Sequence, residues 1–322
     1  MKGVCAANQS DQEFLAEMQL ERLRKTVSWA GTRSAFYQKK FTAVGLSDLS
    51  VESLDDIRRF PVTVSMEVTG ESAYDFLTLP LSSILRISSL ERLIRMYTAH
   101  DVAVNVEAVQ RQLVAAGLGR TEVAGLFGNL AESVLLDFHS ALEIQGVTTI
   151  LLGEDYERAA GLLQEAGVNA VIGEPKDVLP LLEAARAGRS GLKEYPLSRV
   201  ICINSTLFNP WRKYIEQRFG AKVTDVFASA VFGSAGLFYE CPEGQGWHLQ
   251  ADKFLAEVIP VASKLADKEN CRIGELVVTT LQNEAMPVIR YRTGQLVRKC
   301  SPGCSCGSIM PLYRPLHEKD EN

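Results

Sequence analysis

The sequence predicts an α/β fold in which parallel strands are flanked by helices and a small antiparallel β-subdomain follows. Two observations support this fold class. Between residues 102 and 228, short apolar stretches of strand length alternate with longer stretches of helical spacing. After residue 234, turn-punctuated strands follow one another directly. Repeated strand–helix units of this length are typical of parallel sheets covered by helices on both faces.

The first part of the chain is predicted to be helical. Residues 11–41 carry apolar side chains at helical spacing with interleaved charges, which indicates an amphipathic helix or helix pair on the surface of a larger body. Ser53 is expected to cap a short helix that Pro61 ends. We therefore expect four regions: an N-terminal helical segment (1–80), an α/β body (81–233), an antiparallel β-subdomain (234–312) and a tail (313–322).

The body and the subdomain are predicted element by element. In the body, apolar stretches predict strands over residues 122–128, 147–153, 168–173, 198–204 and 222–228. Helical periodicity predicts helices over residues 104–119, 133–146, 156–167, 178–188 and 210–220. In the subdomain, short strands are expected within residues 235–250, 254–261, 274–281 and 288–300.

The composition excludes several classes of partner. The chain has 322 residues, of which 46% are apolar and 23% charged, and its net charge is −5. This charge provides no basic field for nucleic acid. No apolar run approaches the ~20 residues that span a bilayer, and the first residues lack the apolar core of a signal peptide. We expect a cytoplasmic protein without membrane contact, whose seven cysteines are reduced or bind metal.

Four side chains in the antiparallel region form a candidate metal site. Cys241 and His248 have C-x6-H spacing, and Cys304 and Cys306 form a C-x-C pair. Three thiolates and one imidazole suit tetrahedral Zn²⁺, and a complete set of four protein ligands indicates a structural site. Cys300 is an alternative ligand because C-x3-C spacing is also feasible. Unrelated surface thiols are the other reading, and Cys5, Cys202 and Cys271 are interpreted as ordinary thiols.

Several short motifs resemble one known family. They are "GELVVTTL", "MPVIRYRTG", "YECPEGQGWHLQ" and "PGCSCG". With the order of elements, they make residues 20–310 resemble the large N-terminal domain of phenylacetate–coenzyme A ligases and coenzyme F390 synthetase-like proteins. These belong to the adenylate-forming superfamily, whose members turn a carboxylic acid and ATP into an acyl-adenylate. Some relatives of these ligases carry a similar Cys/His/Cys/Cys set.

The groups that this family uses to handle ATP are changed here. A run like "SSGTTG", whose backbone N–H groups wrap the phosphates, is reduced to Ser88 and Ser89, followed by Leu90 and Glu91. Val231 falls where the resemblance places a Mg²⁺-binding glutamate, and valine cannot bind a hard cation. Gln295 replaces the acid that would accept hydrogen bonds from the ribose hydroxyls. The mobile C-terminal domain with its catalytic lysine is expected to be absent, since the chain ends at Asn322.

The resemblance also implies residues for ligand contact. The implied nucleotide-binding residues are Asn204, Ser205, Thr206, Phe227, Ser229 and Gln295. The implied acyl pocket consists of Phe127, Gly128, Asn129, Leu130, Phe232 and Gly233, with Ser234 beside them. Each set has an alternative reading. Residues 204–206 are also suited to capping the next helix, and the two phenylalanines to filling the core.

The changed motifs lead to three hypotheses. The first is a pseudoenzyme that has lost ATP-dependent adenylation and serves a binding or partner role, for an aryl or acyl ligand or a nucleotide. The alternative is an aromatic acid–activating ligase completed by a separate lysine-bearing domain. A third is a transfer reaction that starts from a ready-made acyl-adenylate or thioester. We assign no catalytic residue, expect zinc but weakened ATP or AMP binding, and consider a homodimer or an active ligase partner.

Overall fold

The computed structural model describes residues 9–70, 72–90, 93–130, 133–187, 197–204, 210–233, 235–261, 272–300 and 303–316. The chain divides into two compact units. Unit 1 comprises Met1–Val104, Ala230–Phe232 and Cys241–Asn322, and unit 2 comprises Asn105–Ser229 and Gly233–Glu240. The domain boundaries predicted from the sequence remain predictions.

Unit 2 contains the predicted parallel sheet. Its strand order is β4-β3-β5-β6-β7, and all of its strand pairs are parallel. The strands are β3 (Val123–Phe127), β4 (Thr148–Gly153), β5 (Ala170–Gly173), β6 (Arg199–Asn204) and β7 (Lys222–Phe227). The helices are α4 (Ala99–Ala115), which begins in unit 1, α5 (Ser133–Gln145), α6 (Tyr156–Glu165), α7 (Pro175–Ala187) and α8 (Arg212–Phe219). The strand–helix alternation of this region therefore predicted its architecture.

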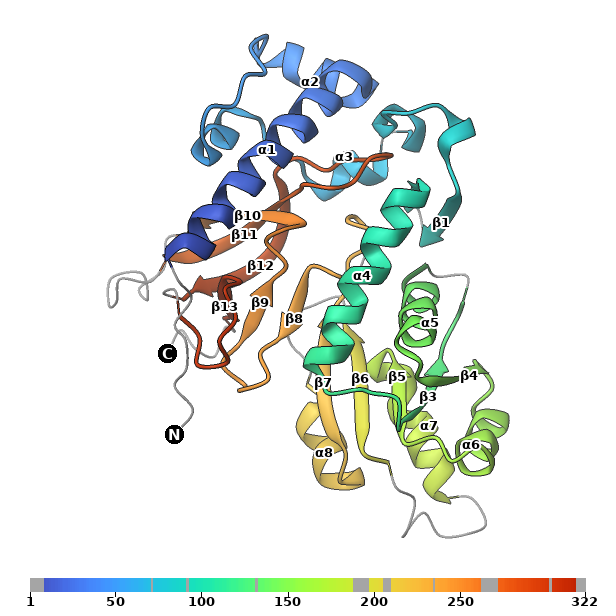
Figure 1. The fold of residues 1–322 in the computed structure, drawn as a ribbon. Coiled ribbons are helices and arrows are strands. Elements are labelled where there is room, and N and C mark those ends of the chain that lie inside the picture. The colour runs from blue at the N-terminus through green and yellow to red at the C-terminus, as the bar shows by residue number, and fades with distance from the viewer. Residues whose placement is uncertain are drawn as a thin grey trace. The chain divides into compact units, whose positions relative to one another are not determined.

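Both faces of this sheet are buried at its central strands β5 and β6. Val171 of β5 and Val200 of β6 pack in one cluster with apolar side chains of α6, α7 and α8. Their neighbours Ile172 and Ile201 are also buried, and they point to the opposite face because strand side chains alternate. Helix α5 contacts β3 and β4 (Figure 1). Burial on both faces explains why these strands read as continuous apolar runs.

Unit 1 contains the predicted antiparallel strands. Its sheet has the order β10-β11-β12-β13-β9, with antiparallel pairs along it. The strands are β9 (Trp247–Leu249), β10 (Phe254–Pro260), β11 (Arg272–Thr280), β12 (Tyr291–Lys299) and β13 (Leu312–Pro315); β8 (Phe238–Glu240) belongs to unit 2. Strand β13 includes residues expected in the C-terminal tail, because its main chain pairs with β12 and β9.

The N-terminal helices form an aromatic core in unit 1. They are α1 (Gln9–Arg33), α2 (Ala35–Ala43), η1 (Leu54–Arg59), α3 (Ser65–Gly70), η2 (Ala73–Phe76) and η3 (Leu81–Ser83). The predicted helix pair is present. Ser34 is the N-cap of the second helix, and its hydroxyl oxygen accepts a hydrogen bond from the N–H of Tyr37. Phe36 stacks on Phe76, and Tyr37 packs edge-on against both. Helix α1 lies beside β10 (Figure 1), and Gln19 donates to the carbonyl of Phe254.

A hairpin of β1 (Arg86–Leu90) and β2 (Leu93–Tyr97) completes unit 1. The strands are antiparallel, and their register places Ser88 opposite Arg95 and Leu90 opposite Leu93. Residues 91 and 92 alone separate the paired strands in the sequence. Among the described residues, no helix has the length and apolar character needed to cross a membrane.

Candidate metal centre and ligand site

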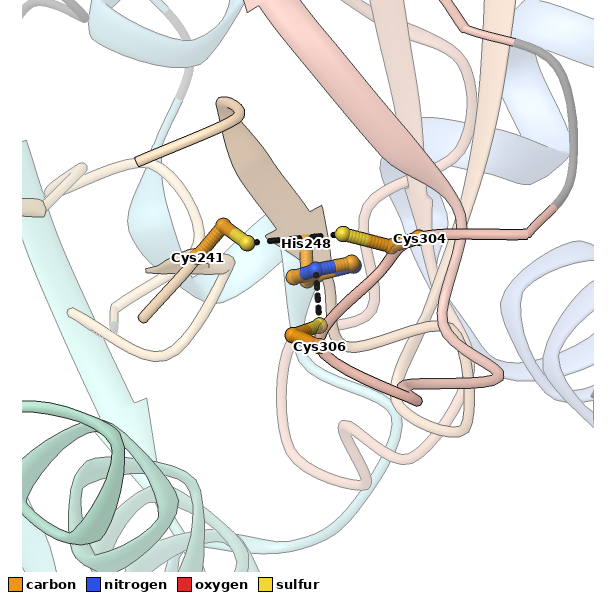
Figure 2. Close-up of side chains that lie close together, drawn as sticks. All are labelled: Cys241, His248, Cys304 and Cys306. Atoms are coloured by element: carbon orange, nitrogen blue, oxygen red, sulfur yellow. Dashed lines mark hydrogen bonds between the residues drawn. The ribbon is translucent and has the colours of Figure 1, made fainter. Parts of the chain in front are cut away.

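The four predicted metal ligands come together in unit 1. Cys241 follows β8, His248 lies on β9, and Cys304 and Cys306 lie in the turn between β12 and β13. Their ligand atoms all lie within 4.8 Å of one another (Figure 2). The sulfur atoms of Cys241 and Cys304 are 3.4 Å apart, and the Cys306 sulfur is 3.2 Å from Nε2 of His248. Residues 63 positions apart in the chain thus form one cluster.

These distances fit a tetrahedral ion. Zn–S distances of about 2.3 Å place neighbouring ligand atoms of a tetrahedral site roughly 3.5–3.8 Å apart. The observed pairs are slightly closer, so a small outward movement of the side chains would admit the ion. Cys241, His248 and Cys304 are buried and Cys306 is half-buried. Cys300 packs against this cluster, but the converging group of the described residues does not include it.

The His248 ring is oriented for ligation. Its Nδ1 lies 2.9 Å from the carbonyl oxygen of Met310, a contact that requires a proton on Nδ1. The lone pair of Nε2 therefore faces the thiols, which is the arrangement that metal-binding histidines use. Burial lowers the pKa of His248, although the Met310 carbonyl opposes the shift, and the imidazole is held neutral.

The thiols do not share one environment. Burial raises the pKa of Cys306 to about 12. Burial alone would also raise the pKa of Cys304, but the N–H of Cys306 and the thiols of Cys306 and Cys241 leave it lowered. A metal ion would have to displace the protons of these thiols on binding.

The implied nucleotide-binding residues are distributed over both units. Asn204 ends β6, Phe227 ends β7 and Ser229 follows β7, all in unit 2, whereas Gln295 lies on β12 in unit 1. Phe227 is buried and packs edge-on against Phe238 with ring centroids 6.2 Å apart. Ser205 and Thr206 lie outside the described residues. Glu91, which follows the two serines that remain of the implied phosphate loop, also lies outside them.

A polar network that no sequence motif indicates holds Asn204. The Asn204 amide donates to Oδ1 of Asp225, and Nη1 of Arg212 donates to Oδ2 of the same residue at 3.1 Å. Arg212 also pairs with Glu240 at 2.6 Å and donates to the carbonyl of Val223. The only signal in the sequence was a pair of acids in apolar strands, Asp225 and Glu240. Such acids usually have a cationic partner when buried.

Four of the implied acyl residues, Phe127, Gly128, Phe232 and Gly233, have packing or hydrogen-bond contacts within their own unit. Phe127 belongs to the unit 2 core, and its ring centroid lies 5.0 Å from that of Tyr156. The N–H of Gly128 donates to the carbonyl of Gly153. Asn129 is exposed, Leu130 is half-buried, and the carbonyl of Gly233 accepts from Asn105. Phe232 lies in unit 1 between Phe254 and Tyr291. Ser234 lies outside the described residues.

Sequence relatives and solved structures point to the same group of ligases, although no family model matches the chain. The phenylacetate-coenzyme A ligase of Thermus thermophilus is 28% identical over 323 residues, which cover 95% of this chain and 70% of that ligase. The ligase of the same name from Escherichia coli is 29% identical over 300 residues, covering 88% and 67%.

Among solved structures, an open conformation of 2-hydroxyisobutyryl-CoA ligase in complex with 2-HIB-AMP and CoA superposes with a TM-score of 0.81. It is 19% identical in sequence, and the match covers 95% of this chain and 69% of that ligase. This likeness shows the fold. Together with the sequence relatives, it supports the resemblance to the adenylate-forming family: the chain is homologous to the phenylacetate–coenzyme A ligases, and the matches cover about 70% of their length.

Proposed function

We propose that this chain is a phenylacetate–CoA ligase-like protein that no longer performs ATP-dependent acyl adenylation. It acts instead as a binding or partner protein for an aryl or acyl ligand or a nucleotide. The β1–β2 hairpin is the observation that carries this proposal. It occupies the segment in which the resemblance implies a phosphate-binding loop.

The hairpin supports the proposal because a paired strand points its successive backbone N–H groups in alternate directions. Each residue from Arg86 to Leu90 has a partner between Tyr97 and Leu93. The oxygen atoms of the Ser88 and Tyr97 hydroxyls are 3.0 Å apart, so this serine also interacts within the hairpin. A phosphate-binding loop needs consecutive backbone N–H groups that point at the anion. Two intervening residues cannot replace the four-residue Gly/Thr segment of the family loop.

Two further positions support the loss of triphosphate handling. Val231 is 9% exposed and offers only an apolar side chain where a Mg²⁺ ligand would stand. Gln295 keeps its place in the "YRTGQ" turn, where its N–H donates to the Thr293 hydroxyl at 3.1 Å. The Gln295 side chain carries no negative charge. The resulting loss of ribose affinity is about 1–2 kcal/mol, because hydrogen bonds to ionised groups are the stronger class.

The proposal keeps a ligand-binding role because the scaffold is retained. The structural relative carries an acyl-adenylate and CoA on the same fold. We propose that zinc at Cys241, His248, Cys304 and Cys306 fixes the turns of unit 1, without a catalytic role. A site with four protein ligands has no open position for a substrate.

Titration calorimetry and a pyrophosphate-release assay test this proposal. The purified chain is titrated with ATP·Mg²⁺, AMP and a panel of aromatic acids, with an active phenylacetate–CoA ligase as the positive control. We expect the dissociation constant of ATP to exceed about 100 μM, which corresponds to a binding free energy weaker than about −5.5 kcal/mol. We also expect no pyrophosphate and no acyl-AMP from the chain alone.

Formation of acyl-AMP by the unaided chain would overturn the proposal. Pyrophosphate release only after addition of a separate lysine-bearing domain would favour the ligase alternative instead. Detection of the acyl-AMP itself by mass spectrometry excludes a contaminating ATPase as the source of pyrophosphate.

A further inference from the structure

A pocket of about 180 Å³ in unit 1 lies against α1 and is separate from the candidate sites above. Arg22, Lys25, Thr26 and Trp29 line one side of it. Their spacing of three, four and seven residues places them on one face of the helix. His100, at the start of α4, and residues 281–284, which follow β11, line the other side.

The wall of this pocket is fixed by hydrogen bonds. Arg22 and Gln282 both donate to the backbone carbonyl of Asp252, Gln282 at 3.1 Å. Gln19, one turn earlier on α1, donates to the carbonyl of Ala251 at 2.8 Å. Helix α1 and the 281–284 segment are therefore tied to the same turn. Side chains held on such rigid elements keep their relative positions without a ligand.

The charge in the pocket is predominantly positive. Arg22 and Lys25 supply two cations, His100 supplies an imidazole that can donate a hydrogen bond, and Glu284 is the acid among the lining residues. The Lys25 ammonium lies 4.8 Å from the centroid of the Trp29 ring, which holds it beside the pocket. One carboxylate oxygen of Glu284 accepts from the Thr98 hydroxyl at 3.2 Å.

Asp101, next to His100, does not offset this positive charge fully, because backbone N–H groups engage its carboxylate. One oxygen accepts from Glu284 at 2.7 Å, and the other accepts from Thr98 at 2.9 Å and Ala285 at 3.1 Å. These contacts also fix the 281–284 segment against α4 within unit 1.

We propose that this pocket binds a phosphate group, as inorganic phosphate or as a phosphomonoester. Its lining residues on α1 and α4 carry a guanidinium, an ammonium, a hydroxyl and an imidazole. Donors that approach from several directions suit a tetrahedral oxyanion better than a planar carboxylate. The volume is below the roughly 300–1,000 Å³ of pockets for drug-sized ligands, and it suits a small anion. This inference does not depend on the proposed loss of adenylation.

Calorimetric titration of the full chain tests this site. Inorganic phosphate and glycerol phosphate are compared with acetate at matched ionic strength, because exposed charge interactions are screened by salt. We expect saturable binding of phosphate and weaker or no binding of acetate. Glycerol phosphate binding more tightly than phosphate would identify an ester as the natural ligand class, and the reverse order would identify the free anion.

Three charge variants separate this site from general anion binding. Lys25 is exposed, so Lys25→Gln leaves the fold intact and is expected to weaken phosphate binding roughly tenfold. Glu284→Gln removes the repelling carboxylate and is expected to strengthen binding several-fold. Lys213→Gln, the same loss of charge at an exposed position of α8 in unit 2, is the control and should leave binding unchanged. Equal weakening by Lys25→Gln and Lys213→Gln, acetate binding as tight as phosphate, or no saturable phosphate binding would overturn the proposal.

Discussion

The side-chain amide of Asn204 donates to the carboxylate of Asp225 at 3.0 Å, although the two residues are 21 positions apart. Both are buried, at 8% and 5% exposure, near the ends of the adjacent strands β6 and β7. A second donor, Arg212, approaches the other oxygen of Asp225. The Asn204 amide therefore has a structural role in unit 2, whatever else it contacts.

Replacing Asn204 with aspartate should destabilise the chain. Asn204→Asp places a second carboxylate beside Asp225 and removes the donor, and buried like charges at this distance are costly. We expect the free energy of unfolding to fall by about 2–4 kcal/mol at pH 7. Urea denaturation of wild type and variant measures the difference. Because the paired acids share a proton more readily at low pH, the difference should shrink at pH 5.

Gln164→Glu is the control for this variant. Gln164 is exposed on α6 in the same unit, so this change from amide to acid should alter stability by less than about 0.5 kcal/mol. A similar loss in both variants would show that added negative charge, rather than the contact with Asp225, is responsible.

Loss of a cluster thiol should release zinc. Cys304→Ser removes a buried ligand, and we expect zinc to fall from about one ion per chain to near zero, with a lower melting temperature. Elemental analysis of the purified chain measures the ion. Chelation of the wild type should lower the melting temperature in the same direction.

Cys300→Ser separates the two sets of ligands that the spacing allowed. Cys300 packs beside the cluster without belonging to the converging group. The variant should therefore retain its zinc. Zinc loss from Cys300→Ser and retention by Cys306→Ser would show that the C-x3-C alternative is correct, since Cys304 is a ligand in both sets.

The buried charge of Arg95 should lower the free energy of unfolding of this chain. Arg95 is 2% exposed, and its Nη2 donates to the carbonyl of Met286 at 2.6 Å. Within the described part of the chain, its Nε and Nη1 have no hydrogen-bond partner. Burial lowers the pKa of this guanidinium. A buried, incompletely paired charge often costs more than a hydrophobic residue of similar size.

We therefore expect Arg95→Met to raise the free energy of unfolding by about 1–3 kcal/mol, after the loss of the Met286 contact. Thermal and urea unfolding measure this. Arg58→Met, at a side chain 58% exposed and paired with Asp55, whose side chain is 79% exposed, is the control and should change stability by less than about 1 kcal/mol. A clear destabilisation by Arg95→Met would mean that the charge has stabilising partners.

Periodicity in the sequence was sufficient to predict most of the fold. The alternating elements of unit 2 have strong local patterns, since their strands are apolar on both faces. The Cys/His set was also predictable, because C-x6-H and C-x-C spacing are local features. The strand–helix pattern repeats regularly, and the two ligands within each pair lie close together in the sequence, although the two pairs are some 60 positions apart.

The features that were missed depend on distant partners. Strand β13 is only four residues long, and its pairing with β12 and β9 defines it. The partner of Asn204 lies on another strand, and nothing in "SRVICIN" indicates an acceptor. The pocket residues of α1 were visible only as charges on an amphipathic helix, because the 281–284 segment that faces them comes some 250 positions later.

The buried phenol of Tyr37 should make the chain lose stability at alkaline pH. Its side chain is fully buried, and its hydroxyl oxygen accepts from the N–H of Ile289 at 2.8 Å. Burial, opposed by that hydrogen bond, raises the pKa of Tyr37 from 10.0 to about 12. The folded state therefore holds this proton more tightly than the unfolded state. The stabilisation that the protonated Tyr37 phenol gives the folded state is complete below pH 10, and it is lost as the pH rises to about 12.

The raised pKa of Tyr37 sets the size of this loss. The free energy of unfolding should fall by on the order of 2–3 kcal/mol between pH 10 and pH 12. Tyr37→Phe keeps the ring and removes the ionisable group. It should cost about 1–3 kcal/mol at pH 8, because the Ile289 N–H loses its acceptor. Other tyrosines and the lysines titrate in the same range, so the informative quantity is the difference between wild type and variant. That difference should narrow as the pH rises from 9 to 11.5 in urea denaturation. A constant difference across this range would show that Tyr37 ionises in the folded state as easily as in the unfolded chain.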